Sequence, residues 1–69
     1  MPHAAITMIP GRNAEQKKEL AKQVQELLVE KLQIDEKFVS VSVEDIPKEK
    51  WQESMENFSD DIMYVKPGV

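Results

Sequence analysis

The fold is decided by one stretch of the chain, Phe38 to Glu44, which reads FVSVSVE. Its three valines alternate with two serines and a glutamate, so the valines point to one side and the polar residues to the other. This period of two, carried by β-branched residues, predicts a strand with one buried face and one exposed face. The neighbouring segments must therefore cover the valine face.

The segment before this strand has the period of an amphipathic helix, from about Ala14 through Leu32. Asn13 and Gln16 mark its start, because they have the spacing of a capping box. Apolar side chains then recur at helical spacing, namely Leu20, Val24, Leu27, Leu28 and Leu32. Lysines and glutamates occupy the remaining surface, which predicts a helix with one buried and one solvated face.

Another alternating segment, residues 2–9, precedes the helix and ends at Pro10-Gly11. Two strands joined through a helix by short links form a β–α–β unit, with parallel strands and a right-handed crossover. We therefore predict an α/β (α+β) protein built on a single β–α–β unit. Because the helix covers only one face of a two-stranded sheet, we expect the other face or the strand edges to meet a second copy.

The chain after Glu44 predicts smaller elements. Pro47 suits the first turn of a helix, and Trp51, Met55 and Phe58 follow at helical spacing, so we expect a short second helix. For the rest of the chain we predict a turn at residues 60–61, a small third strand at 62–65 and a frayed tail at 66–69.

Size and composition restrict both architecture and partners. We expect a chain of 69 residues to form one domain, residues 1–69. The chain has no Cys and one His, which excludes disulfides and the usual zinc sites. Self-association is then the means left to stabilise a small core. The net charge of −4 argues against nucleic acid. With no long apolar run and no signal segment, we expect a soluble, cytoplasmic protein that does not bind membranes.

Three residues are candidates for chemistry, each with a simpler alternative. Removal of Met1 would turn Pro2 into a secondary amine suited to general-base catalysis, although Pro2 also suits the start of an edge strand. Arg12, the only arginine, suits a carboxylate but equally a solvated turn. Trp51 could line a pocket or simply belong to the core.

Together these residues resemble the 4-oxalocrotonate tautomerase family. The resemblance covers residues 2–51 without internal gaps, and it is closer to the dimeric branch of that superfamily. The matching positions are Pro2, Gly11-Arg12, Glu15-Gln16-Lys17 and the stretch from Ile46-Pro47-Lys48 to Trp51.

The resemblance implies a β–α–β protomer that forms dimers or hexamers, with active sites completed by neighbouring subunits and without a cofactor. It implies that Pro2 is the base and that Arg12 binds a substrate carboxylate. Trp51 would make the site apolar and lower the pKa of the proline. In the family a second arginine lies in the second strand, and the equivalent position is predicted here to be Ser40, whose hydroxyl can donate to an enolate oxygen. A small 2-keto acid with one carboxylate, or an aryl enol, is therefore the expected substrate.

Two other functions remain open from the sequence. One is hydration or dehalogenation of a 3-haloacrylate, which the same superfamily includes and which would need more arginines. The other is a non-catalytic oligomeric binding module, which applies if Met1 is retained. His3 is the only rival to Pro2 as a base in the first half of the chain.

Overall fold

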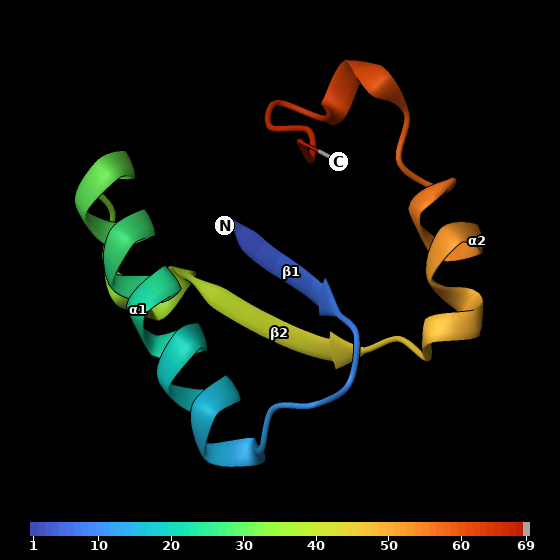
Figure 1. The fold of residues 1–69 in the computed structure, drawn as a ribbon. Coiled ribbons are helices and arrows are strands. Elements are labelled where there is room, and N and C mark those ends of the chain that lie inside the picture. The colour runs from blue at the N-terminus through green and yellow to red at the C-terminus, as the bar shows by residue number, and fades with distance from the viewer. Residues whose placement is uncertain (69) are drawn as a thin grey trace.

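The computed structural model describes residues 1–68 and confirms the predicted α/β (α+β) class. Its helices and strands are, in order, β1 (His3–Met8), α1 (Ala14–Leu32), β2 (Ser40–Asp45) and α2 (Trp51–Met55). The two strands pair in parallel, from His3 opposite Ser40 to Met8 opposite Asp45. Figure 1 shows α1 on one side of the strands, which is the predicted β–α–β arrangement.

Side-chain interactions fix the first turn of α1. Asn13 Oδ1 accepts the backbone N–H of Gln16 at 2.8 Å, and Gln16 Oε1 accepts that of Asn13 at 3.0 Å. This is the capping box predicted from the sequence. Lys17 Nζ lies 2.5 Å from Asp45 Oδ2 and ties the same turn to the end of β2. The connection from β1 to α1 therefore ends at a fixed point beside the sheet.

Asn13→Ala is expected to lower the free energy of unfolding by about 1 kcal/mol, the usual cost of losing a helix N-cap. Urea denaturation followed by circular dichroism measures the change, at equal protein concentration because association would add to the apparent stability. Asn57→Ala is the matched control, at an exposed turn position outside the helices and strands. Equal unfolding of the two variants would show that the capping box does not stabilise the protein.

The strands differ from the prediction at their ends. β1 is one residue shorter at each end than predicted, and β2 begins two residues later because Glu36–Phe38 form a 3-10 turn. The Asp35 side chain accepts the backbone N–H of Lys37 at 3.0 Å, and such local bonds compete with strand pairing. The alternation is unaffected, because Val41 and Val43 are half-buried while Ser40 and Ser42 are exposed.

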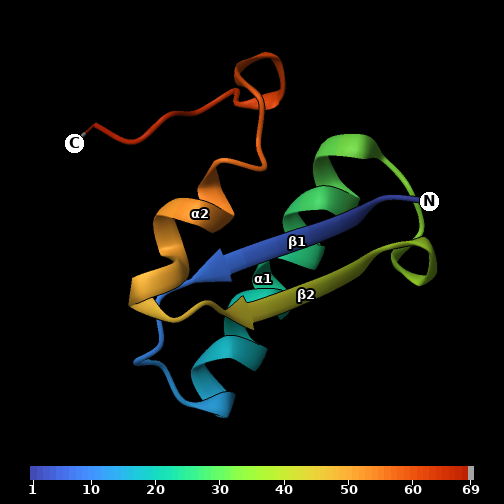
Figure 2. The same cartoon turned by 90° about the vertical axis from the view of Figure 1, so that its right-hand side faces the viewer.

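Beyond β2 the chain leaves the sheet in short turns. The predicted helix after Pro47 is confirmed as a 3-10 turn (Lys48–Lys50) leading into α2, although the helix ends before Phe58. The predicted strand at 62–65 is wrong, because a 3-10 turn (Asp60–Ile62) is followed by irregular chain. Figures 1 and 2 show this segment apart from β1 and β2, which pair only with each other among the described residues. The predicted frayed tail at 66–69 includes Val69, which lies outside the described residues.

The single chain has almost no closed core. Val39, at 8% exposure, is the only buried hydrophobic residue in the described part of the chain. The radius of gyration is 13.5 Å, against about 11 Å for a compact chain of this length. The accessible surface is 5951 Å², against about 4,400 Å² for a compact monomer of this mass. This chain therefore leaves roughly 1,500 Å² more surface open than a compact monomer would.

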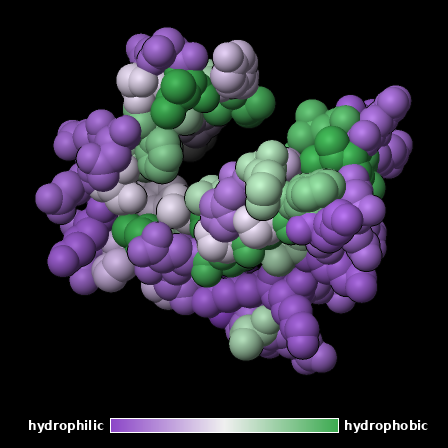
Figure 3. Space-filling model, turned by 180° about the vertical axis from the view of Figure 1, so that it is seen from behind, coloured by the Kyte–Doolittle hydropathy of each residue, from purple (hydrophilic) through white to green (hydrophobic). Residues whose placement is uncertain are grey.

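Much of that open surface is apolar. On the α1 face predicted to be buried, Leu20, Leu27 and Leu32 are exposed, because two strands are too narrow to cover the whole stripe. Ile62, Tyr64 and Val65 are exposed in the C-terminal segment. Figure 3 shows hydrophobic residues at the surface of the β–α–β unit and of the C-terminal segment, with an open gap between the two. The apolar surface is thus divided between parts of the chain that do not cover one another.

Candidate active site

Pro2 is held at the beginning of the sheet. Its carbonyl oxygen accepts the backbone N–H of Ser40 at 3.3 Å, directly before the first paired residues of β1 and β2. Pro2 is half-buried, whereas Met1 is 98% exposed. While Met1 is attached, the Pro2 nitrogen belongs to an amide and has no basic lone pair. Loss of Met1 would leave a secondary amine on a backbone that β2 already holds.

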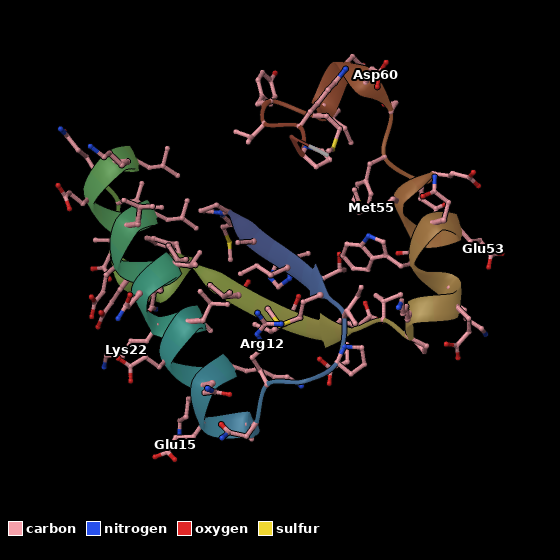
Figure 4. All side chains as sticks on the ribbon, viewed as in Figure 1. Arg12, Glu15, Lys22, Glu53, Met55 and Asp60 are labelled. Carbon is pink, nitrogen blue, oxygen red and sulfur yellow. The ribbon has the colours of Figure 1, made fainter. Side chains whose placement is uncertain are left out.

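Arg12 lies in the connection between β1 and α1. Gly11, which precedes it, has a φ of +147°, a conformation that residues with a side chain rarely adopt. Figure 4 shows the Arg12 side chain directed back toward the strands, whereas Glu15 and Lys22 of α1 point away from them. The ion pairs among residues 1–68 join Lys17 to Asp45 and Lys66 to Asp60. Within these residues the Arg12 guanidinium is therefore not paired with a carboxylate. Arg12 is exposed and available to bind an anion.

Trp51 is the first residue of α2 and is half-buried. The main contacts of α2 are with the 3-10 turn that precedes it, and not with the β–α–β unit. Phe58, predicted to share a face with Trp51, lies outside the helix and is 41% exposed. Trp51 is therefore not part of a closed core within the single chain, and its ring is available to line a surface.

The single chain does not bring Pro2 together with Arg12 and Trp51. A strand rises about 3.3 Å per residue, so the chain from Pro2 to Met8 covers about 20 Å. Because the strands are parallel, Pro2 and Ser40 lie where both strands begin. The connection carrying Arg12 and the start of α2 follow from the other end, as Figure 2 shows. These predicted site residues thus form two separate groups within one chain.

A polar cluster that the sequence analysis did not identify lies at the Pro2 end. The His3 ring bridges the strands, with Nδ1 2.6 Å from Ser40 Oγ and Nε2 3.0 Å from Ser42 Oγ. All three residues are exposed, on the sheet face opposite the half-buried valines. The alternation of β2 already placed both serines on one face, but His3 could be added only once the strand register was known.

The described residues offer no metal site, since residues 1–68 contain no group of three or more His, Asp or Glu side chains placed to hold an ion. A surface hollow of about 410 Å³ lies among charged side chains of α1 such as Glu15 and Lys22, away from the predicted site residues. Within residues 1–68, neither helix combines the length and apolar character needed to cross a bilayer.

Comparison with known proteins identifies the family of this chain. Residues 2–60 match the family model described as "Tautomerase enzyme", and the chain belongs to this family. It is similar to 2-hydroxymuconate tautomerase of Comamonas testosteroni, with 43% identity over 51 residues, covering 74% of this chain and 81% of the relative. It is also similar to a protein of Xylella fastidiosa (strain 9a5c) named "Probable tautomerase", with 34% identity over 55 residues, covering 80% of this chain and 67% of the relative.

These matches confirm the resemblance to the tautomerases. They support a tautomerase-type function, that of an isomerase, for this chain. The family match begins at Pro2 and continues past Trp51 to residue 60. It therefore extends beyond residues 2–51, where the sequence motifs alone placed the resemblance.

Proposed function

We propose that this protein interconverts the enol and keto forms of a small 2-keto acid, without a cofactor and with the Pro2 nitrogen as base after removal of Met1. One observation carries the proposal: the family match starts at Pro2, whose carbonyl is anchored by the Ser40 N–H. An amine at this position is oriented by the sheet before a substrate arrives. That is the geometry a general base requires.

The reaction needs only a proton shuttle. The enol hydroxyl gives its proton to the Pro2 nitrogen, and the electron pair moves through the conjugated system. A carbon of that system then takes a proton from the ammonium, which restores the neutral amine. An α-amino group titrates at about 7.7–8.0 in model peptides, so the amine can both accept and return a proton near neutral pH.

Arg12 supports the assignment of a carboxylate substrate. A guanidinium offers two parallel N–H donors that match a carboxylate, and Arg12 has no carboxylate partner among the described residues. Ser40 adds a neutral donor near Pro2, and Trp51 adds an apolar wall. With one arginine, the site suits a substrate with one carboxylate, such as a 2-hydroxy-2,4-dienoate or phenylenolpyruvate.

A site that uses Pro2, Arg12 and Trp51 together must take them from two copies of the chain. Pro2 of one copy would face Arg12 and Trp51 of its neighbour, because the two groups lie at opposite ends of β1. The excess surface of roughly 1,500 Å² per chain is in the range that obligate interfaces bury on each partner. The exposed leucines of α1 and the apolar C-terminal segment would supply that interface.

The protein is accordingly expected to be a homo-oligomer, a dimer or a hexamer, at micromolar concentration. Size-exclusion chromatography with light scattering gives the mass directly. Leu27→Glu, which places a charge on an exposed apolar position of α1, should shift the population toward smaller species. Lys22→Glu, on the charged face of the same helix, should not. A stable, active monomer of the unmodified chain would refute the two-copy site.

The activity is tested with protein whose mass shows that Met1 is absent. Loss of the enol absorbance of 2-hydroxy-2,4-pentadienoate or phenylenolpyruvate reports ketonisation. Turnover well above the buffer-catalysed rate is expected. If protein with a free Pro2 gives no such turnover, the proposed activity on these enols is wrong. A non-catalytic binding module then becomes the better account of the fold.

A further inference from the structure

The His3 ring is hydrogen-bonded at both of its nitrogens. Nδ1 lies 2.6 Å from Ser40 Oγ and Nε2 lies 3.0 Å from Ser42 Oγ, so one imidazole from β1 holds two hydroxyls of β2. The ring plane and both hydroxyl oxygens are thereby fixed relative to one another. Holding these side chains in one arrangement costs conformational entropy. Because they lie on an exposed sheet face, the arrangement adds little to packing.

The protonation of the His3 ring determines which serine hydroxyl has a hydrogen left to donate to a ligand. In either neutral tautomer, one ring nitrogen donates to a serine and the other nitrogen accepts from the second serine. The serine that accepts keeps its own hydrogen for a third partner. In the protonated ring both nitrogens donate, and both serines keep their hydrogens. At least one serine hydroxyl therefore has a hydrogen to donate to a ligand in every state of the ring.

We propose that His3 is a positioning residue of this tautomerase, which directs a hydroxyl of Ser40 or Ser42 to the substrate oxygen that becomes the enolate. The inference rests on the proposed function, because it takes Pro2 as the base. It adds His3 and Ser42 to the site and gives Ser40 a defined hydrogen-bonding partner. Hydrogen bonds in a chain polarise one another, so a hydroxyl bonded to the imidazole is a better donor than an isolated serine.

Position along the sheet supports this role. The Ser40 N–H holds the Pro2 carbonyl, and the Ser40 side chain holds the ring of the next residue, His3. Pro2 and the hydroxyl cluster therefore lie at the same end of the sheet, where both strands begin, and Ser40 is bonded to both. Proton transfer at a carbon next to a carbonyl develops charge on an oxygen close to that carbon. A donor near the base is thus where the transition state needs it.

The inference is tested with four variants and a control, all with Met1 removed. Ser40→Ala and Ser42→Ala each remove one hydroxyl, His3→Leu removes both ring nitrogens, and His3→Gln keeps one donor and one acceptor on a side chain of similar reach. Thr7→Val is the control, because it removes a hydroxyl at the other end of β1, opposite Glu44. Light scattering and circular dichroism verify that each variant keeps its assembly and fold.

At least one serine variant should lower kcat about 100-fold, a typical loss when one preorganised donor is removed, with KM changed less than about 3-fold. His3→Leu should lose as much, His3→Gln should recover part of kcat, and Thr7→Val should match the unmodified protein. Combining His3→Leu with the sensitive serine variant should add little, because the residues act as a unit. If the unmodified protein is active and both serine variants keep its kcat, the inference is wrong while the proposed function stands. If His3→Gln falls as far as His3→Leu, or if KM alone changes, the positioning role is likewise refuted.

Discussion

Protein that retains Met1 is expected to lose about 10²–10⁴-fold in the rate of enol ketonisation, the range attributed to one general base. The cause is electronic, because the Pro2 nitrogen of the longer form is part of a planar amide and its lone pair is delocalised. The enol proton then has no amine to accept it. The loss should appear in kcat and not in KM, since the carboxylate is expected to bind at Arg12 in both forms.

The processed form is the unmodified protein after loss of Met1. The blocked form has a leucine inserted between Met1 and Pro2, which prevents removal of Met1 and keeps the Pro2 nitrogen as an amide. Intact mass verifies each form. Pro2→Ala, processed to a free amine, is the matched control because it keeps a base of lower intrinsic strength at the same place. It should retain part of the activity. If the blocked form turned over enol as fast as the processed form, Pro2 would not be the base, and His3 would be the next candidate.

Arg12→Ala is expected to lower kcat/KM for a 2-keto acid enol about 10–100-fold. The loss corresponds to about 1.5–3 kcal/mol, the range for a hydrogen bond to a charged group. Arg12→Lys should recover only part, because an ammonium keeps the charge but lacks the planar pair of donors. Glu15→Ala is a control close in sequence, since the Glu15 side chain points away from the strands. Unchanged kinetics in both Arg12 variants would mean that Arg12 is a solvated turn residue.

Mixing variants tests whether Pro2 and Arg12 act across two copies. When the blocked form and Arg12→Ala are unfolded together and refolded at equal amounts, about a quarter of the sites should combine a free Pro2 with an intact neighbouring Arg12. Activity should then reach about a quarter of the unmodified value and exceed both parents. If each site lay within a single chain, the mixture would give only the average of the parent preparations.

The features that could be predicted from the sequence were those determined by residues close together along the chain. The Asn13 and Gln16 capping box and the valine alternation of β2 depend on spacing alone, and both are confirmed. The start of β2 was misplaced because Asp35 forms a local bond that competes with the strand pattern. The strand predicted at 62–65 was wrong because a strand requires a neighbour, which a local pattern does not reveal.

The candidate site was only partly predictable, for a related reason. Pro2, Arg12 and Trp51 were identified by residue type and position, but a linear pattern does not state that they fall at opposite ends of the sheet. The His3, Ser40 and Ser42 cluster depends on the parallel register, which pairs residues 37 positions apart. Candidate residues for chemistry were therefore identified from the sequence more readily than the side chains that contact them.

The two-stranded sheet also exposes this protein to aggregation. Within residues 1–68 neither strand has a neighbour on both sides, so β1 and β2 each present an outer row of backbone N–H and C=O groups with which another extended segment can pair. Glu44 and Asp45 put negative charge at one end of β2, and charges of this kind act as gatekeepers against non-native pairing. The middle of each strand carries no charged side chain. The outer edges of the strands therefore carry a risk of non-native pairing that rises with protein concentration.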